Sequence, residues 1–292
     1  MDQAHKLTLP ELADIPRGGG RIAMVTAYDA SSARLADAAG IDMILVGDSA
    51  AMTVLGHDST VPITLEEMLM LTRAVTRVVR RAFVVADMPF GSYQLGEDQA
   101  LANAIRFVKE AGADAVKLEG AGRTLTRLSA IHDAGIPVMG HLGLTPQSVK
   151  LLGGYKARGR TAAEARRIYD EARTLERVGC FAVVLEAIPA AVAGHISAAL
   201  KVPTIGIGAG PACDGQVLVW HDLLGLTPGH VPRFVKQYAD LAATIRAALE
   251  SYAADVRGGT FPDAPRTYGM SEQELARFES QLSNKAGEKI QS

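Results

Sequence analysis

Residues 111–119 read AGADAVKLE, and this short stretch contains the pattern that decides the fold. A helical segment ends at Gly112, a residue type that often follows helices because it accepts a left-handed backbone without steric cost. A short apolar run follows, interrupted by Lys117 and ended by Glu119. Continuous rather than alternating apolar residues are typical of parallel strands that are covered on both faces. The stretch therefore predicts a helix followed by a buried parallel strand.

The same unit recurs along the chain. The predicted strands span residues 22–28, 43–48, 82–87, 115–119, 137–141, 181–186, 203–208 and 217–221. Between them, Thr64 with Glu67 and Thr161 with Glu164 have the spacing of helix capping boxes. Eight β/α alternations favour a single α/β domain, a (β/α)8 TIM barrel, with a doubly wound open sheet as the main alternative. We expect an N-terminal segment over 1–20, the catalytic barrel over 21–262, and a partly mobile C-terminal extension over 263–292 that contains a helix near 270–282.

Composition narrows the class of protein. The 292 residues include 30 Lys and Arg against 32 Asp and Glu, a net charge of −2, and 5% are aromatic. Such a chain is not typical of a nucleic-acid-binding protein. No apolar run reaches the roughly 18 residues of a membrane span, and the N-terminus lacks the apolar region of a signal peptide. We therefore expect a soluble cytoplasmic protein with no nucleic-acid or membrane partner, whose two cysteines, Cys180 and Cys213, are free thiols.

Polar and charged side chains gather where the predicted strands end. They are Asp48 with Ser49, Asp87, Lys117 with Glu119, His141, Glu186, and His221 with Asp222. The carboxyl ends of all strands in a parallel barrel meet at one rim, where barrel enzymes place their active sites. Each acid alone could instead cap a helix, and Lys117 with Glu119 could form a structural ion pair. Their coincidence at one rim favours a site.

The residue types at this rim indicate metal-assisted acid–base chemistry. Asp48, Asp87 and Glu119 are hard oxygen donors of the kind that Mg²⁺ binds while it keeps positions for substrate oxygens. Glu186 ends an apolar strand and is the candidate general base. The segment GIGAG at 206–210 could approach a ligand closely, but Pro211 stands where a dinucleotide-binding motif requires glycine. Residues 142–160 form a long connection at the same rim, and we expect a lid there.

Several segments together resemble the ketopantoate hydroxymethyltransferase family. They are VGDS at 46–49, GHDST at 56–60, ADMPF at 86–90, VKLEG at 116–120, GHLGLTPQS at 140–148, GGYK at 153–156 and GHVPRF at 229–234. The resemblance covers about residues 21–262 and implies a TIM barrel. It also implies that a hydroxymethyl group passes from 5,10-methylenetetrahydrofolate to 3-methyl-2-oxobutanoate through an enolate stabilised by Mg²⁺. The implied product is 2-dehydropantoate, on the pathway to pantothenate.

The same resemblance implies a role for each rim residue. Asp48 and Asp87 would bind one Mg²⁺ per subunit directly, Glu119 would be its third carboxylate, acting directly or through water, and Glu186 would accept the proton. The implied substrate-binding residues are Asp48, Ser49, Asp87, Lys117 and His141. Self-association into a homodecamer, a pentamer of dimers, is also implied. Two alternatives stay open: a Mg²⁺-dependent 2-oxo-acid lyase or mutase of the isocitrate lyase and phosphoenolpyruvate mutase type, and a barrel that binds a ligand without turnover.

Overall fold

A computed structural model describes residues 5–229 and 231–288 of the chain. His230 of the GHVPRF segment, the first four residues of the predicted N-terminal segment and the last four of the predicted extension lie outside the described residues. The chain divides into two compact units, one that ends at Asp240 and one that begins at Leu241. The boundary expected near residue 262 stays a prediction.

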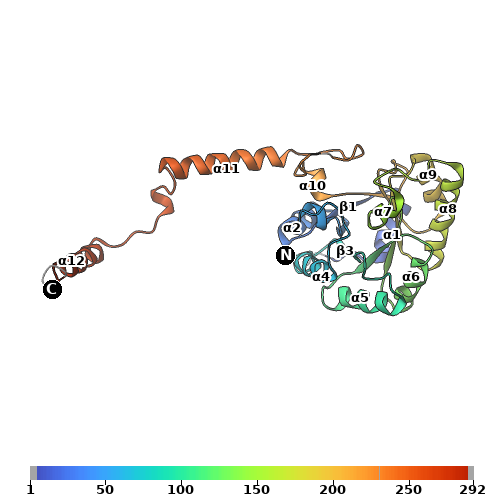
Figure 1. Cartoon of the computed structure of the whole chain (residues 1–292), viewed down its shortest axis with the longest axis horizontal. Helices are drawn as coiled ribbons and strands as arrows, with labels where there is room; N and C mark the ends of the chain where they lie inside the picture. The colour runs from blue at the N-terminus through green and yellow to red at the C-terminus, as the bar shows by residue number, and fades with distance from the viewer. Residues whose placement is uncertain (1–4, 230, 289–292) are drawn as a thin grey trace. The chain divides into compact units, whose positions relative to one another are not determined.

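The first unit contains a closed barrel of eight parallel strands in sequence order (Figure 1). The strands are β1 (Ile22–Thr26), β2 (Met43–Val46), β3 (Phe83–Asp87), β4 (Ala115–Glu119), β5 (Val138–Gly143), β6 (Ala182–Glu186), β7 (Thr204–Ile207) and β8 (Gly215–Leu218). The last strand pairs with the first, with Met24 opposite Val217, and this pairing closes the barrel. The predicted TIM barrel is confirmed, and the open sheet is excluded.

Within the first unit, the longer helices lie on the outside of the barrel, as Figure 1 shows. In chain order the helical elements of the first unit are α1 (Leu9–Arg17), α2 (Ala30–Ala38), α3 (Ala50–Thr53), α4 (Leu65–Thr76), α5 (Glu97–Lys109), α6 (Thr124–Asp133), η1 (Pro146–Ser148), α7 (Val149–Leu152), α8 (Ala162–Arg177), α9 (Ala190–Ala199) and α10 (Trp220–Leu223). The capping box at the start of α4 is confirmed, because Thr64 and Glu67 each accept a hydrogen bond from the other's backbone. At α8 only half of the box forms, since Glu164 accepts from the backbone of Arg160 instead.

The eighth strand lies two residues earlier than predicted. Gly215 and Gln216 pair through their backbones with β1 and β7, a contribution that needs no apolar side chain. Trp220, predicted to be in this strand, instead begins α10, and its N–H donates to Thr26 Oγ1 at 2.9 Å. Residues 208–214, all described, join β7 to β8 without a helix.

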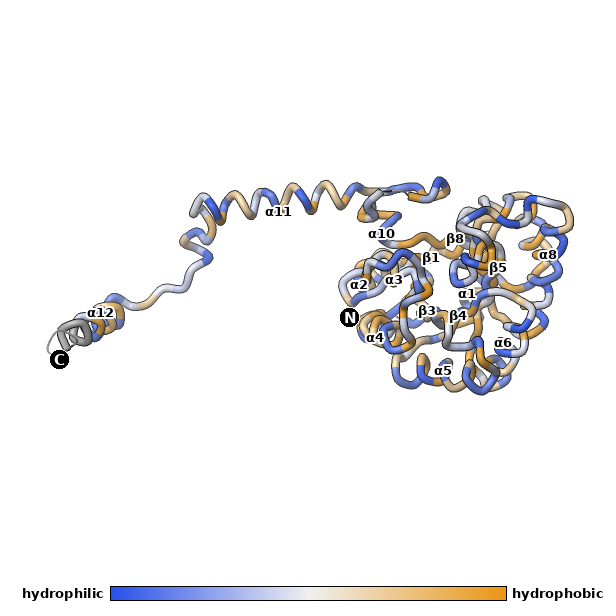
Figure 2. Tube along the Cα trace, viewed as in Figure 1, coloured by the Kyte–Doolittle hydropathy of each residue, from blue (hydrophilic) through white to orange (hydrophobic). Residues whose placement is uncertain are grey.

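Two apolar layers build the core. One fills the inside of the barrel with side chains such as Met24, Val85, Met139 and Val184, and Leu12 of α1 joins this layer. The other lies between the strands and the outer helices, so that the strands appear as hydrophobic segments in Figure 2. Because side chains on a strand alternate between faces, the inward positions of each strand continue toward its carboxyl end. The apolar interior therefore passes directly into the polar rim.

The second unit consists of helical segments. These are α11 (Leu241–Gly258), η2 (Ala264–Arg266) and α12 (Glu272–Glu288), the last of which confirms the helix expected near residues 270–282.

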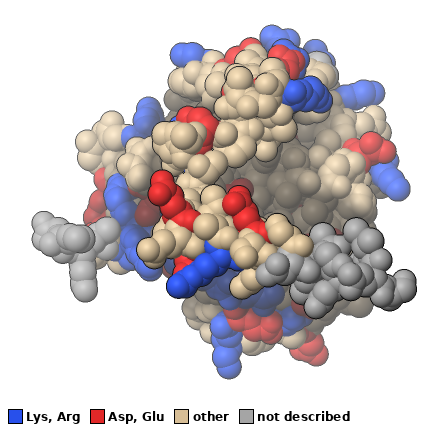
Figure 3. All heavy atoms as spheres, turned by 90° about the vertical axis from the view of Figure 1, so that its left-hand side faces the viewer, with Lys and Arg blue, Asp and Glu red and all other residues tan. Residues whose placement is uncertain are grey.

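Within residues 5–229 and 231–288, every helix is too short or too polar to cross a membrane. Acidic and basic side chains are interspersed over the face of the molecule that Figure 3 shows.

Candidate active site

Neighbouring strands place the predicted rim residues side by side. Asp87 on β3 is level with Lys117 on β4, and Glu119 on β4 is level with His141 on β5. All four are buried. Each shares its strand face with side chains of the barrel interior, as Val85 does for Asp87. The barrel thus brings together, at one end of its interior, charged groups that lie far apart in the sequence.

The loop after β2 supplies Asp48 and Ser49. The Asp48 N–H donates to Asp87 Oδ2 at 3.1 Å, so the two aspartates are in contact. A Cβ atom at Gly47 would lie 2.8 Å from Ser49 Oγ, so a side chain there would displace the Ser49 hydroxyl. Ser49 Oγ and the Tyr28 hydroxyl are 2.8 Å apart, and burial raises the pKa of Tyr28 to about 12, so this phenol keeps its proton.

Lys117 is the cation nearest the aspartates. Its Nζ lies 2.6 Å from Asp87 Oδ1, so the buried ion pair forms with Asp87 and not with Glu119, two positions away on the same strand. Burial lowers the pKa of Lys117, but Asp87, Glu119 and Asp48 together outweigh burial and raise it. Lys117 is therefore a fixed positive charge.

His141 lies between two glutamates and this lysine. Its Nδ1 is 3.5 Å from Glu119 Oε1 and 3.3 Å from Lys117 Nζ, and its Nε2 is 3.2 Å from Glu186 Oε2. The approach to Glu186 is an ion contact without the angle of a hydrogen bond. Burial and Lys117 lower the pKa of His141, the two glutamates raise it, and the balance is a pKa of about 9. The imidazole can therefore present positive charge at neutral pH.

The carboxylates outnumber the cations in this buried cluster. Burial, and then the charges of Asp87 and Glu119, raise the pKa of Asp48 well above its ordinary value. Burial likewise raises the pKa of Asp87, although the charge of Lys117 and its contact with Asp87 lower it. Within the described residues no three His, Cys, Asp or Glu side chains are grouped closely enough to hold a metal ion alone. Mg²⁺, however, binds through one or two carboxylates and completes its shell with water and substrate oxygens, so Asp48 and Asp87 fit it.

Gln147 is a site residue that the sequence did not single out. It lies on η1 in the connection after β5, and its amide Nε2 donates to Asp48 Oδ2 at 2.8 Å. Its backbone N–H donates to Glu119 Oε2 at 3.0 Å. The signal was present only as part of the GHLGLTPQS segment, since nothing in the composition of this loop distinguishes a buried glutamine from an exposed one.

The expected lid has two different parts. Its first part, through Val149, is largely buried, whereas Leu151 is 89% and Tyr155 53% exposed. Closure of this connection over the site stays a prediction. The glycine-rich segment after β7 does not leave the expected space for a ligand, because a Cβ atom at Gly208 would lie 2.7 Å from the Phe234 ring. There the chain itself occupies the space.

His221 and Asp222 lie apart from the buried charges, on α10. The His221 ring packs beside Tyr28 with ring centroids 5.6 Å apart, and Asp222 accepts a hydrogen bond from Thr227.

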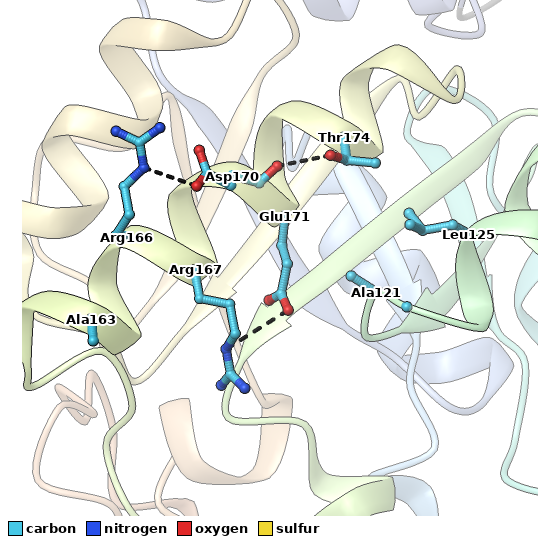
Figure 4. A pocket seen from close by; sticks show the side chains of 9 residues that line it. Ala121, Leu125, Ala163, Arg166, Arg167, Asp170, Glu171 and Thr174 are labelled. Atoms are coloured by element: carbon cyan, nitrogen blue, oxygen red, sulfur yellow. Dashed lines mark hydrogen bonds and ion pairs between the residues drawn. The ribbon is translucent and has the colours of Figure 1, made fainter.

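A separate hollow of about 540 Å³ lies between α6 and α8 (Figure 4). It is lined by paired charges such as Arg166 with Asp170, and none of the rim residues described above lines it.

The chain is similar to one family over most of its length. Residues 6–264 match the family model described as ketopantoate hydroxymethyltransferase. A protein named 3-methyl-2-oxobutanoate hydroxymethyltransferase from Thermobifida fusca is 55% identical over 264 residues, which cover 90% of this chain and 94% of that one. A protein of the same name from Moorella thermoacetica is 57% identical over 268 residues, covering 92% and 100%.

Among solved structures, similarity extends to barrels of other activities. Phosphonopyruvate hydrolase in complex with oxalate and Mg²⁺ has a TM-score of 0.56 at 15% identity, covering 96% of this chain and 98% of that chain. A 2,3-dimethylmalate lyase has a TM-score of 0.56 at 16% identity, with the same coverage. At such identities the likeness shows a shared fold alone, so the lyase or mutase alternative gains no support beyond the fold. By the match over residues 6–264 and the identity to its relatives, the chain belongs to the ketopantoate hydroxymethyltransferase family.

Proposed function

We propose that this chain transfers a hydroxymethyl group from 5,10-methylenetetrahydrofolate to 3-methyl-2-oxobutanoate and gives 2-dehydropantoate, a step of pantothenate biosynthesis. One observation carries the proposal: a barrel of this family holds Asp87, Lys117, His141 and Glu186 in contact with one another at its strand ends. The acceptor is the one that the relatives' name states, and the folate donor follows from the family resemblance. The cytoplasm stays the expected compartment.

The proposed metal is one Mg²⁺ per subunit, held by Asp48 and Asp87 with Glu119 as a third carboxylate. When bound, Mg²⁺ would act as a Lewis acid toward the carboxylate and keto oxygens of the oxo acid. Two observations support this assignment. Asp48 is buried beside other carboxylates and has a raised pKa, and its N–H donates to Asp87 Oδ2, which holds the two aspartates in contact.

The cationic residues suit the binding of an oxo acid. Lys117 is a fixed charge held by Asp87, and His141 is protonated below about pH 9, so both can donate to the oxygens on which charge develops. Ser49 is oriented by Tyr28 and offers a hydroxyl to the same substrate. These donors are buried or partly buried, where a hydrogen bond to charge is worth more than in water.

Glu186 is the proposed proton acceptor. Its side chain is 15% exposed, against 3% for His141, so Glu186 is the more accessible of the two groups. Glu186 takes the proton from C3, and the electron pair of that C–H bond moves into the enolate. The C3 carbon then bonds to the folate methylene carbon as the first of the two C–N bonds of that carbon breaks. Water supplies the hydroxyl oxygen as the second C–N bond breaks, and the proton from C3 and one proton of the water end on the two folate nitrogens.

The proposal is tested by proton exchange at C3 of 3-methyl-2-oxobutanoate in D₂O with Mg²⁺ and no folate. Wild-type protein should catalyse the exchange, and Glu186→Gln should slow it by about 100-fold or more, the usual contribution of a positioned base. Glu171→Gln, on the outer face of α8, is the matched control and should exchange normally. Exchange that persists in Glu186→Gln would remove Glu186 from this role. Formation of 2-dehydropantoate after the folate is added separates the transferase from a lyase or mutase.

A lysine Schiff base would be a different mechanism, and Lys117 is the amine at the site that could form it. An ammonium held 2.6 Å from Asp87 with a raised pKa is a poor nucleophile. Borohydride added to the protein with its oxo acid should therefore leave Lys117 unmodified. A reduced adduct on Lys117, identified by mass spectrometry, would contradict the enolate mechanism.

We also propose that the chain self-associates into a homodecamer, a pentamer of dimers. The support within the second unit is a row of exposed apolar side chains on α11 at heptad spacing: Ile245, Leu249, Tyr252 and Val256. Such a row is typical of a surface that packs against another chain. Light scattering after gel filtration should give about ten times the 30.8 kDa of one chain, and Leu249→Glu should lower it. A wild-type mass of one chain would contradict the assembly.

A further inference from the structure

We infer that Gln147 is a positioning residue that orients Asp48 and Glu119 and ties the connection after β5 to both carboxylates. The inference deepens the proposed function and rests on it, because it concerns the same metal site. In this role Gln147 contacts neither substrate nor metal. It acts through the two acids that it holds.

The backbone N–H and both polar side-chain atoms of Gln147 are committed to this arrangement. The backbone N–H donates to Glu119 Oε2 at 3.0 Å. The side-chain Nε2 donates to Asp48 Oδ2 at 2.8 Å and to the Met88 carbonyl at 3.0 Å. The side-chain Oε1 accepts from the Tyr93 hydroxyl at 2.5 Å. Because Gln147 is 6% exposed, water cannot easily replace these partners.

Asp48, Met88 and Tyr93 together determine which way the amide faces. The Tyr93 hydroxyl donates to Gln147 Oε1, and the hydroxyl oxygen of Tyr93 accepts a longer contact of 3.4 Å from the Glu119 N–H. Turning the amide over would place its oxygen against the Asp48 carboxylate and the Met88 carbonyl, two acceptors that offer no proton. The amide therefore keeps its two N–H groups on the side of Asp48.

This orientation has a consequence for Asp48. Within the described residues, Gln147 is the one hydrogen-bond donor to the Asp48 carboxylate, and it occupies Oδ2. The other oxygen, Oδ1, accepts no hydrogen bond from the described residues and is the atom left for a cation. A neutral amide can fix one oxygen in this way without adding a competing positive charge to the cluster.

The connection after β5 thereby becomes part of the site. Gln147 lies 99 positions from Asp48 and 28 from Glu119 in the sequence, yet one residue holds acids that follow β2 and end β4. Any displacement of η1 would release both acids together. Outer partners of metal ligands typically contribute 10- to 100-fold to metal affinity, so a measurable loss is expected when Gln147 is replaced.

The test measures Mn²⁺ binding to the full-length protein without substrates, from the electron paramagnetic resonance signal of free Mn²⁺. Gln147→Met keeps the length of the side chain and removes its hydrogen bonds, and should weaken binding by about 10-fold or more. Tyr93→Phe removes one of the three groups that orient the amide, and should weaken binding less but measurably. Gln99→Met is the matched control, since Gln99 also makes two side-chain hydrogen bonds but reaches no site carboxylate.

The outcomes separate this inference from the proposed function. Tight binding by wild type and Gln99→Met, with a graded loss in Tyr93→Phe and Gln147→Met, supports it. Wild-type binding that Gln147→Met retains within twofold overturns the inference alone. If wild type binds no Mn²⁺, the proposed metal site is wrong and the inference falls with it. If Gln147→Met does not fold, Tyr93→Phe decides, and an unchanged affinity in that variant overturns the inference.

Discussion

Replacing Asp48 with asparagine should make the metal-free protein more stable, although it removes a ligand of the proposed metal site. Asp48 is 4% exposed and lies beside Asp87, with Glu119 also near. Asparagine has nearly the same volume, and its carbonyl oxygen can still accept the hydrogen bond from Gln147. The substitution therefore removes one buried negative charge while it leaves the packing and the nearest donor in place.

The size of the gain follows from the charges in the cluster. Four carboxylates, on Asp48, Asp87, Glu119 and Glu186, face the two cations Lys117 and His141. Removing a buried charge that is only partly compensated stabilises proteins by about 1–3 kcal/mol, after part of the attraction to Lys117 is lost. For a unit of this size, about 2–4 °C in melting temperature corresponds to each kcal/mol, so a rise of about 2–12 °C is expected.

The sign of the pH dependence is fixed by the raised pKa of Asp48. The folded protein holds this proton more tightly than the unfolded chain, so the wild type loses stability as the pH rises through the raised value. Asparagine does not ionise, and its advantage is therefore absent at low pH and complete above that value. The melting temperatures are therefore compared at several pH values up to pH 8, and the advantage of Asp48→Asn should grow along this series.

The assay is thermal unfolding followed by circular dichroism at pH 8, with EDTA and separately with millimolar Mg²⁺. In EDTA, Asp48→Asn should melt above wild type, and exposed Asp133→Asn should melt close to it. With Mg²⁺ at about 100 times its dissociation constant, wild type should gain about 2.7 kcal/mol and Asp48→Asn almost nothing. An Asp48→Asn protein that melts below wild type in EDTA would refute the reasoning.

Three further expectations follow from the same structure. Gly143→Ala should prevent folding or lower the free energy of unfolding by about 3 kcal/mol or more, because its Cβ would lie 2.1 Å from the backbone oxygen of Glu186 at a φ of +96°. Gly153→Ala, in open space at a φ of +72°, should lower it by only about 1–2 kcal/mol. Equal melting temperatures of the two variants would contradict this. His141 should stabilise the EDTA-treated protein fully below pH 6.5 and lose that contribution as the pH rises through about 9, so melting temperatures should fall over this range more in wild type than in His141→Asn; parallel profiles would count against it. Thr64→Ala should lower stability by about 1 kcal/mol through loss of the α4 cap and leave C3 exchange unchanged, and slower exchange would mean that α4 affects the site.

The barrel could be predicted because its strands are buried on both faces and are therefore continuous runs of apolar residues in the sequence. All eight strands lie within two residues of their predicted starts. The error at β8 has a clear cause. Gly215 and Gln216 join the sheet through backbone hydrogen bonds, whereas the apolar residues Val219 and Trp220 leave it. Hydropathy indicates which residues are buried, not which residues pair in a sheet, and around β8 these are different residues.

The site could be predicted only as far as strand periodicity reaches. Lys117 and Glu119 do share the inward face of β4, as spacing indicated. Their partners lie on other strands: Asp87 pairs with Lys117, and His141 contacts Glu119. Partner choice depends on register across the barrel, which is not encoded locally. Gln147 was missed for the same reason, because only closure of the barrel brings its loop beside Asp48.

The near-zero net charge of the chain conceals an imbalance at the place where it matters. On the face that Figure 3 shows, acids and bases are interspersed and screened by water, so they contribute little to stability. Inside the rim, Asp48 and Asp87 are held buried with raised pKa values, which makes the folded state costly when the site contains only protein groups. A divalent cation that binds only the folded chain gains the same interaction that the metal-free protein lacks. Metal-free stability and metal affinity should therefore change in opposite directions. Asp48→Asn should raise the metal-free stability and abolish the metal affinity.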